Sequence, residues 1–341
     1  MFYFVPLLIA FTISLVLTPL VRKIALLTRI IDAPVARKIH KKPTPLLGGV
    51  ALFLSFFITT VIFWIFGYIT DSKISDINII AILAGGFVLI IGGLLDDKYN
   101  FKPYQQIPFP IIAAGIIVFS GIKIQFISNP LGGILEFSLL AGILLAFFWI
   151  LGMIYTTKLL DGLDGLVTGV TTIGAFIIFA VSLFWDVPSS GTSVLALILA
   201  GASLGFLIFN WHPAKIFLGE GGSVFCGFML GTLAIISGSK IATALLILGI
   251  PILDVFWVIA NRIWQGKSIA KGDNKHLHFR LLDIGLSHRQ TVIFLYFLTA
   301  AFGVTSLFLH SKGKIIALGI LAAVMIILAS SLMLIYKFKN E

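Results

Sequence analysis

The chain has 341 residues, of which 59% are apolar and only 11% are charged, and its net charge is +10. Soluble domains carry about 25% charged residues, so this composition excludes an ordinary globular protein and predicts an integral membrane protein. The excess positive charge does not indicate nucleic-acid binding, because a bias of lysine and arginine toward one side of a membrane explains most of it. The single cysteine, Cys226, excludes intrachain disulfides and argues against a thiolate metal site.

Apolar segments recur along the chain at the length of a membrane-spanning helix, which needs about 20 residues. The first segment lacks a basic leader and a small-residue cleavage site, so we interpret it as an uncleaved span. The expected fold is therefore all-α, a polytopic bundle of about 11 transmembrane helices in a single domain, residues 1–341. The predicted spans are 2–21, 46–68, 79–95, 107–122, 137–156, 166–185, 194–210, 223–238, 241–260, 292–309 and 315–336.

The lysines and arginines predict the orientation of this bundle. Nineteen of the 24 lie in the odd-numbered connections or in the C-terminal tail, and five lie on the other side. Because cytoplasmic loops carry the excess of positive residues, we expect the N-terminus outside and the C-terminus in the cytoplasm. The cytoplasmic loops are then those near 22–45, 96–106, 157–165, 211–222 and 261–291. Outside, residues 122–137 alternate weakly and predict a small hairpin.

The first cytoplasmic loop is basic and rich in proline. Arg37, Lys38 and His40 supply hydrogen-bond donors that suit a phosphate group. Gly48 and Gly49 open the next span, where they favour close contact between helices. Taken alone, this segment is also typical of an ordinary basic loop beside a membrane.

Two carboxylates, Asp96 and Asp97, follow the third predicted span directly. Adjacent carboxylates repel each other unless a cation lies near them. Mg²⁺ binds a few carboxylates together with phosphate oxygens and water, so the pair suits this ion. A solvated helix cap explains the pair equally well when nothing else is considered.

The sharpest signal is the run Asp161-Gly-Leu-Asp164-Gly at the end of the fifth span. If this run is helical, both carboxylates share one face, and the glycines allow a ligand to approach closely. A structural role explains the run poorly, because two glycines weaken a helix and two acids oppose membrane insertion. We therefore interpret Asp161 and Asp164 as functional.

The last two cytoplasmic loops add further candidates. Glu220 lies in a glycine-rich turn that can present N–H groups to a phosphate. His276 and His278, with Arg280, predict an anion clamp or a metal pair, and the absence of a thiolate disfavours zinc. His212, His288 and His310, each taken singly, are more typical of structural or solvated histidines.

Asp254, after Pro251, is the one acid placed deeper in a span, and the sequence indicates no partner for it.

In this order, these motifs resemble those of the polyprenyl-phosphate N-acetylhexosamine-1-phosphate transferases, integral membrane enzymes of glycosyltransferase family 4 type. The resemblance covers residues 7 to 291 and is greatest to the undecaprenyl-phosphate N-acetylglucosamine-1-phosphate transferase branch. It rests on DxPxxRKxHxxPxPxxGG at 32–49, Asp96-Asp97, DGLDGL at 161–166, FxGxxGS at 217–223 and HLHxRLLDxGLSHRQ at 276–290.

The resemblance implies a reaction and a location. A polyprenyl phosphate attacks the β-phosphorus of a UDP-N-acetylhexosamine, UMP leaves, and the lipid-linked sugar starts a cell-envelope polysaccharide such as lipopolysaccharide or teichoic acid. The expected partners are undecaprenyl phosphate, the UDP-sugar and membrane lipids, with no nucleic acid and with a homodimer as an option. The site is expected on the cytoplasmic face of the plasma membrane, with Mg²⁺, or alternatively Mn²⁺, as the cofactor.

The resemblance also implies roles for individual residues. The catalytic candidates are Asp96, Asp97, Asp161, Asp164 and His276. The substrate-binding candidates are Arg37, Lys38, His40, Lys158, His278 and Arg280. The expected metal ligands are Asp97, Asp161, Asp164 and Glu220.

The chain departs from the family pattern at four positions. Glu220 replaces an aspartate, Lys158 an asparagine, Gln106 a lysine and Phe279 a histidine. We hypothesise that the positive charge of Lys158 compensates for Gln106. The departures leave open an altered donor, the muramoyl-pentapeptide transferase reaction, or an impaired enzyme. A membrane transporter is the alternative from another class, although transporter sites favour the bilayer midplane and paired repeats.

Overall fold

The computed structural model describes residues 3–33, 43–129, 133–185, 190–238, 241–266 and 276–340. Arg37, Lys38 and His40, which were predicted to donate hydrogen bonds to a phosphate, lie outside the described residues. The elements are α1 (Phe4–Leu27), β1 (Ile31–Asp32), β2 (Thr44–Pro45), α2 (Gly48–Ile65), α3 (Asp76–Tyr99), α4 (Pro103–Gln106), α5 (Pro108–Phe119), β3 (Phe126–Ser128), β4 (Ile134–Glu136), α6 (Leu139–Leu160), α7 (Leu166–Trp185), α8 (Gly191–Asn210), α9 (Gly219–Ile236), α10 (Ile241–Trp264), α11 (Leu277–Asp283), α12 (His288–Phe308) and α13 (Ser311–Asn340).

The predicted polytopic all-α architecture is confirmed. Within the described residues, ten helices are long and apolar enough to cross a membrane. The span predicted at 107–122 corresponds to the shorter apolar stretch Pro103–Phe119, which is divided into α4 and α5. The hairpin predicted within 122–137 is also present, since β3 pairs antiparallel with β4 and Phe126 lies opposite Glu136.

Helix α9 forms the centre of the bundle. It packs against α2, α3, α6 and α7, and every residue of α9 except Glu220 is buried. A helix with so few polar residues belongs in the interior, because it has no polar face to turn toward water. The one residue that escapes burial is therefore the carboxylate at its first turn.

Glycines let α2 and α3 approach the beginning of α9 at backbone distance. A Cβ atom on Gly93 of α3 would lie 2.0 Å from the Gly221 nitrogen, and one on Gly49 of α2 would lie 2.3 Å from the Gly222 nitrogen. No side chain fits at such distances, and small residues at helix interfaces permit this packing in membranes. The close contact expected at Gly48-Gly49 is thus confirmed, and it brings the ends of three helices together.

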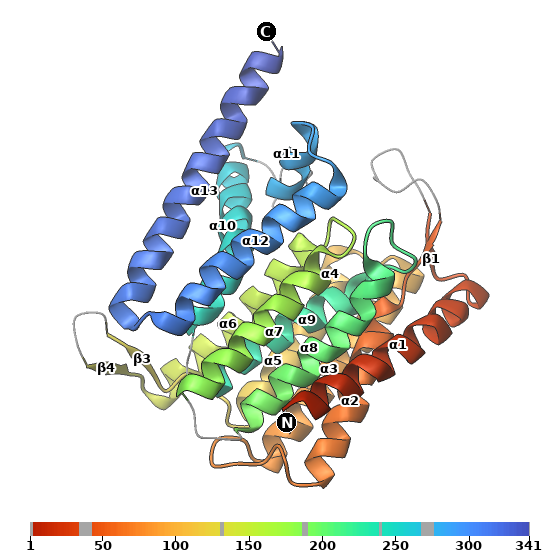
Figure 1. The fold of residues 1–341 in the computed structure, drawn as a ribbon, viewed down its shortest axis with the longest axis vertical. Coiled ribbons are helices and arrows are strands. Elements are labelled where there is room, and N and C mark those ends of the chain that lie inside the picture. Colours follow the sequence, from red (N-terminus) through yellow and green to blue (C-terminus); the bar gives the residue numbers. More distant parts are fainter. Residues whose placement is uncertain are drawn as a thin grey trace.

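Two of the loops predicted to share one side, those near 22–45 and 211–222, contact each other at one end of the bundle. Phe217 N–H donates to the Pro45 carbonyl at 2.8 Å, and Arg22 Nε donates to the Lys215 carbonyl at 3.0 Å. In Figure 1 this end, with β1 and α11, lies toward the C-terminus, whereas β3 and β4 lie toward the opposite end. The fold therefore assembles a site from segments that are distant in sequence.

Candidate functional site

Asp96 shapes the backbone where α3 ends. Asn100 adopts a left-handed conformation (φ 52°), and its N–H donates to the Asp96 carbonyl at 2.7 Å. The Asp96 carboxylate then accepts the Phe101 N–H at 2.8 Å. The chain thus folds back around this side chain, and asparagine is one of the few residues that tolerate the left-handed turn.

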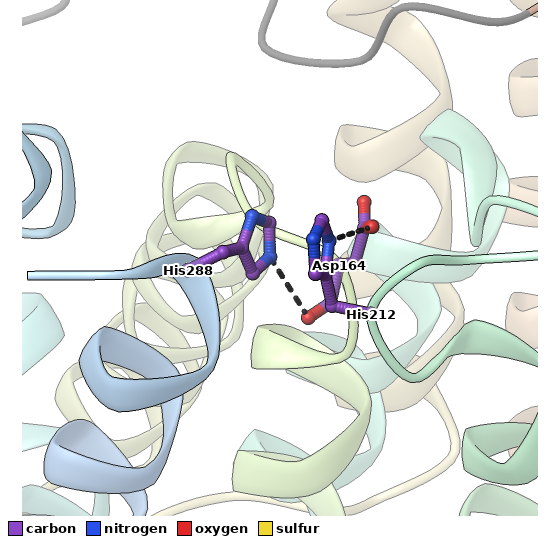
Figure 2. Close-up of side chains that lie close together, drawn as sticks. All are labelled: Asp164, His212 and His288. Atoms are coloured by element: carbon purple, nitrogen blue, oxygen red, sulfur yellow. Dashed lines mark hydrogen bonds and ion pairs between the residues drawn. The ribbon is translucent and has the colours of Figure 1, made fainter.

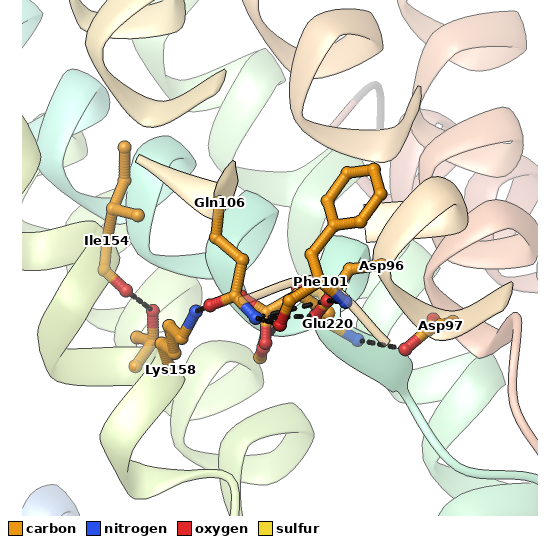
Figure 3. A network of polar contacts seen from close by, with 9 residues as sticks. Asp96, Asp97, Phe101, Gln106, Ile154, Lys158 and Glu220 are labelled. Carbon is orange, nitrogen blue, oxygen red and sulfur yellow. Dashed lines mark hydrogen bonds and ion pairs between the residues drawn. The ribbon is translucent and has the colours of Figure 1, made fainter. Parts of the chain in front are cut away.

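A continuous polar network runs from Asp96 across the bundle (Figure 3). Gln106 Nε2 donates to both Asp96 oxygens, at 3.0 and 3.1 Å, and its Oε1 accepts from Lys158 Nζ at 2.6 Å. The Lys158 ammonium also forms an ion pair with Glu220 Oε1 at 2.5 Å. Residues of α3, α4, α6 and α9 are joined in this way. Three of the four residues at which we expect a departure from the family pattern are therefore joined through Lys158, which contacts both Gln106 and Glu220.

Asp97 lies against the start of α9. Its Oδ1 accepts the Glu220 N–H at 3.2 Å, which satisfies a helix N-terminal donor with a carboxylate. This approach depends on Gly219, whose φ is +75° and whose added Cβ would lie 2.6 Å from Asp97 Oδ2. Only glycine meets both requirements at low cost.

Asp161 follows α6 in a turn and stands in electrostatic contact with three other carboxylates. Crowding by protein atoms, and then the negative charges of Glu220, Asp97 and Asp164, raise the pKa of Asp161 to about 8. The side chain remains exposed, so water screens part of the burial effect. The repulsion from three neighbouring carboxylates acts in the same upward direction.

Asp164 faces a separate cluster with two histidines (Figure 2). Its Oδ2 lies 2.7 Å from His212 Nδ1 and accepts the Ala214 N–H at 3.1 Å. The rings of His212 and His288 are stacked with centroids 3.9 Å apart and planes at 15°. Arg289 Nε donates to the His212 carbonyl at 3.0 Å. The cluster ties the Asp161–Asp164 turn to the loop after α8 and to the beginning of α12.

The cluster of Asp164, His212 and His288 offers three metal-ligand atoms within 4.8 Å of one another. An imidazole nitrogen presents its lone pair in the plane of its ring. The two rings lie in nearly parallel planes, so a cation cannot lie in both unless one ring turns. The observed geometry therefore fits a packed polar contact better than a preformed metal site.

The histidines of the last loop also lie beside the Asp161–Asp164 turn. His276 Nδ1 lies 2.8 Å from Asp254 Oδ2, and the His276 and His278 rings are parallel with centroids 5.7 Å apart. An added Cβ on Gly162 would lie 2.3 Å from His278 Nε2, so His278 packs directly on the turn. Burial, and then the charges of His276 and His288, lower the pKa of His278 to about 3. His278 is therefore neutral near pH 7.

Arg280 points elsewhere. Together with Phe256, Trp257 and Met325 it lines an apolar cavity of about 260 Å³ between α10, α11 and α13. Asp254 and Leu277 also line this cavity.

The structure thus distributes the candidates among three adjoining groups. Asp96, Asp97, Lys158 and Glu220 share one network, with Asp161 in electrostatic contact with two of its carboxylates. Asp164 is engaged by His212, and His276 by Asp254. Sequence reasoning did not single out His212 or His288 as functional, and it did not pair His276 with Asp254. Their sequence separations of 48, 124 and 22 residues leave no local pattern to detect.

Comparison with known proteins agrees with these features. Residues 79–238 match the family model for glycosyl transferase family 4. The chain is 34% identical over 318 residues to a Bacillus subtilis (strain 168) protein named "Probable undecaprenyl-phosphate N-acetylglucosaminyl 1-phosphate transferase", covering 89% of this chain and 85% of that protein. It is 30% identical over 321 residues to a decaprenyl-phosphate N-acetylglucosaminephosphotransferase of Mycolicibacterium smegmatis, covering 86% and 79%. It is also 30% identical over 310 residues to the phospho-N-acetylmuramoyl-pentapeptide-transferase of Bacillus subtilis, covering 84% and 90%.

Proposed function

Because this chain belongs to glycosyl transferase family 4, and within it to the polyprenyl-phosphate sugar-1-phosphate transferases, we propose that it transfers N-acetylglucosamine-1-phosphate from UDP-N-acetylglucosamine to undecaprenyl phosphate. An oxygen of the lipid phosphate bonds to the β-phosphorus of the donor. The bond from that phosphorus to the bridging oxygen breaks, and UMP leaves with that oxygen. The product is a polyprenyl diphosphate sugar, the first lipid-linked intermediate of a cell-envelope polysaccharide.

The observation that carries the proposal is the gathering of carboxylates and one ammonium group at a single end of the bundle. Asp97, Glu220 and Asp161 interact with one another, and Lys158 pairs with Glu220. Phosphoryl transfer needs little covalent help from the protein and depends on alignment and charge neutralisation. A site with this composition, at the end of membrane-spanning helices, suits a lipid phosphate that meets a water-soluble nucleotide.

The donor set fits a hard divalent cation. The ligands offered by Asp97, Asp161 and Glu220 are carboxylate oxygens, which Mg²⁺ prefers and Mn²⁺ also accepts. Their mutual repulsion, expressed in the raised pKa of Asp161, is the condition that a cation relieves. We propose that these three residues hold Mg²⁺ and that Asp164 supports them through the same turn. When bound, the ion would neutralise charge on the diphosphate.

The remaining polar residues position the substrates. The acceptor phosphate is largely ionised near neutral pH, so a strong general base is unnecessary. Gln106 occupies both oxygens of Asp96, which makes Asp96 an orienting group and leaves Asp97 to accept the last proton or place the nucleophile. We propose that Lys158, His276 and His278 contact the donor, whereas Arg280, also expected to bind substrate, faces the apolar cavity described above. His278, being neutral, offers a hydrogen bond rather than charge. We also propose that Arg37, Lys38 and His40 donate hydrogen bonds to a phosphate group of a substrate.

We place the reaction on the cytoplasmic face of the plasma membrane, because most lysines and arginines lie on the side of these loops. The test is UMP release by the purified protein with undecaprenyl phosphate, Mg²⁺ and one of UDP-GlcNAc, UDP-GalNAc or UDP-MurNAc-pentapeptide. We expect release with UDP-GlcNAc that requires the acceptor and stops with EDTA. If no donor leads to UMP release, the proposed enzymatic activity is wrong. Uptake of a solute without UMP formation would indicate a transporter instead.

The second candidate is the muramoyl-pentapeptide transferase reaction. It is supported by the 30% identity to the Bacillus subtilis phospho-N-acetylmuramoyl-pentapeptide-transferase. The same donor panel separates the two. Release with UDP-MurNAc-pentapeptide alone would replace the first candidate by the second.

A further inference from the structure

Asp254 is a carboxylate inside a predicted membrane span that the proposed reaction does not use. It lies in α10, one turn after Pro251, and its side chain is largely buried. A buried carboxylate in such a place is costly unless its oxygens are satisfied. The residues that satisfy it therefore indicate its purpose.

Both oxygens of Asp254 contact the start of the last-loop helix. Oδ2 lies 2.8 Å from His276 Nδ1, and Oδ1 accepts the Leu277 N–H at 2.9 Å. His276 is the N-cap of α11 and makes no side-chain cap bond of its own. One carboxylate thus holds the imidazole ring and the backbone that carries it, which fixes the position and the rotation of the ring.

The contact also determines which nitrogen is available. A carboxylate only accepts hydrogen bonds, so the 2.8 Å contact with Asp254 is a hydrogen bond when Nδ1 of His276 carries the proton. The ring then has only Nε2 left for a ligand, as in histidines oriented by a carboxylate elsewhere. The ring lies parallel to His278, which packs on Gly162 beside Asp161. His276 is therefore held next to the turn that carries the proposed metal ligands.

We infer that Asp254 is a positioning residue that accepts the Nδ1–H of His276 and so fixes the ring, whose Nε2–H donates to an oxygen of the donor diphosphate once the ring takes up a second proton with the bound anion. The inference rests on the proposed function. A carboxylate at Nδ1 stabilises the protonated ring when an anion approaches Nε2, and hydrogen bonds from a charged donor are about twice as strong as neutral ones. Asp254 thus strengthens a contact that it does not make itself.

The first test observes the proton directly. In wild-type protein labelled with ¹⁵N-histidine, His276 is assigned by its loss in His276→Gln, and we expect a protonated Nδ1. In Asp254→Asn the amide keeps an oxygen for Leu277 N–H and turns an NH₂ donor toward the ring, so the proton should move to Nε2. An unprotonated Nδ1 in the wild type would overturn the inference without any variant having to fold.

The second test uses a double-mutant cycle on kcat/KM for UDP-GlcNAc. We expect Asp254→Asn to lower kcat/KM by roughly 10- to 100-fold, and to have little further effect when His276 is already glutamine. Additive losses would show that Asp254 does not act through His276. The matched control is Asp71→Asn, because Asp71 accepts backbone N–H groups of Ile74 and Gly191 at the opposite end of the bundle. It should leave kcat/KM unchanged.

The two tests also separate this inference from the proposed function. A wild-type protein that releases no UMP contradicts the proposed function, while the position of the Nδ1 proton still decides the role of Asp254. Activity in the wild type with additive losses in the cycle contradicts the positioning role alone.

Discussion

Lys158 occupies the junction of the acidic network. Its ammonium group contacts the Gln106 amide oxygen and the Glu220 carboxylate, and both partners are half-buried. Removing one member of such a pair leaves the other charge without compensation, which costs more than the pair itself contributes. These contacts give a physical basis to the hypothesis that Lys158 compensates for the glutamine at position 106, because one ammonium group binds both Gln106 and Glu220.

We predict that Lys158→Asn lowers the rate of UMP release by roughly 10- to 100-fold, since Glu220 loses its counter-charge. The double variant Lys158→Asn/Gln106→Lys should recover most of this loss. A lysine at position 106 is longer than glutamine and brings an ammonium back to the same carboxylate. The measurement is the initial rate with UDP-GlcNAc at saturating Mg²⁺. Wild-type rates in Lys158→Asn alone would contradict the compensating role.

Asp161 gives a prediction for pH. Its pKa, raised to about 8 from an ordinary value near 3.8, means that the carboxyl group is mostly protonated at pH 6. A metal ion must displace this proton, so Mn²⁺ or Mg²⁺ should bind more tightly as pH rises from 6 to 8, by at most about tenfold per unit. Binding is followed by Mn²⁺ electron paramagnetic resonance. Asp161→Asn should bind more weakly and lose part of this dependence, since the remaining carboxylates must also lose protons to bind the ion; an unchanged slope would contradict the assignment.

At the scale of elements, the site is formed by helix ends that only glycine allows to meet. Gly93 of α3 touches the backbone of α9 at Gly221, and Gly219 admits Asp97 to the first turn of α9. The carboxylates are therefore brought together by residues that have no side chain. A substitution of one of these glycines should therefore lower activity by moving the carboxylates apart, although glycine itself takes no part in the reaction.

We predict that Gly93→Ala lowers the thermal unfolding temperature and reduces UMP release at least tenfold. The new Cβ would lie 2.0 Å from a backbone nitrogen that cannot move independently of α9, and overpacking of this kind costs about 1–3 kcal/mol. Gly152→Ala in α6 is the matched control, because nothing lies within 4 Å of its Cβ position. It should preserve activity and leave stability unchanged or slightly higher. Equal behaviour of the two variants would contradict the packing argument.

The elements could be predicted from sequence far better than their contacts. Helix α7 (Leu166–Trp185) has the predicted bounds, because the Asp161–Gly165 turn interrupts the apolar pattern before it. Helix α8 ends at the predicted residue, Asn210, but begins at Gly191, ahead of the predicted start at residue 194. Hydropathy does not indicate that Pro103–Phe119 divides into two helices, or that the last loop forms α11. The pairing of Asp254 with His276 depends on how α10 meets that loop, which is a tertiary property. The stacking of His212 on His288 is of the same kind.

At the scale of the whole molecule, the two ends of the bundle differ in chemistry. One end gathers the loops that carry Asp97, Glu220 and His276. The other end has short connections, including β3–β4 and the turn at Asp71 that caps α8. Since nucleotide sugars are cytoplasmic molecules and positive residues favour that side, the proposed function requires the first end to face the cytoplasm.

This orientation gives the last prediction. Cys226 is the only cysteine and is buried in α9, so single cysteines can be placed at exposed positions without a competing thiol. Ser72 and Lys102 are both exposed, at opposite ends of the bundle. In intact cells, a membrane-impermeant maleimide should label Ser72→Cys and spare Lys102→Cys, and both should react once the membrane is permeabilised. The opposite pattern would place the carboxylates outside, away from the UDP-sugar, and would exclude the proposed reaction at this site.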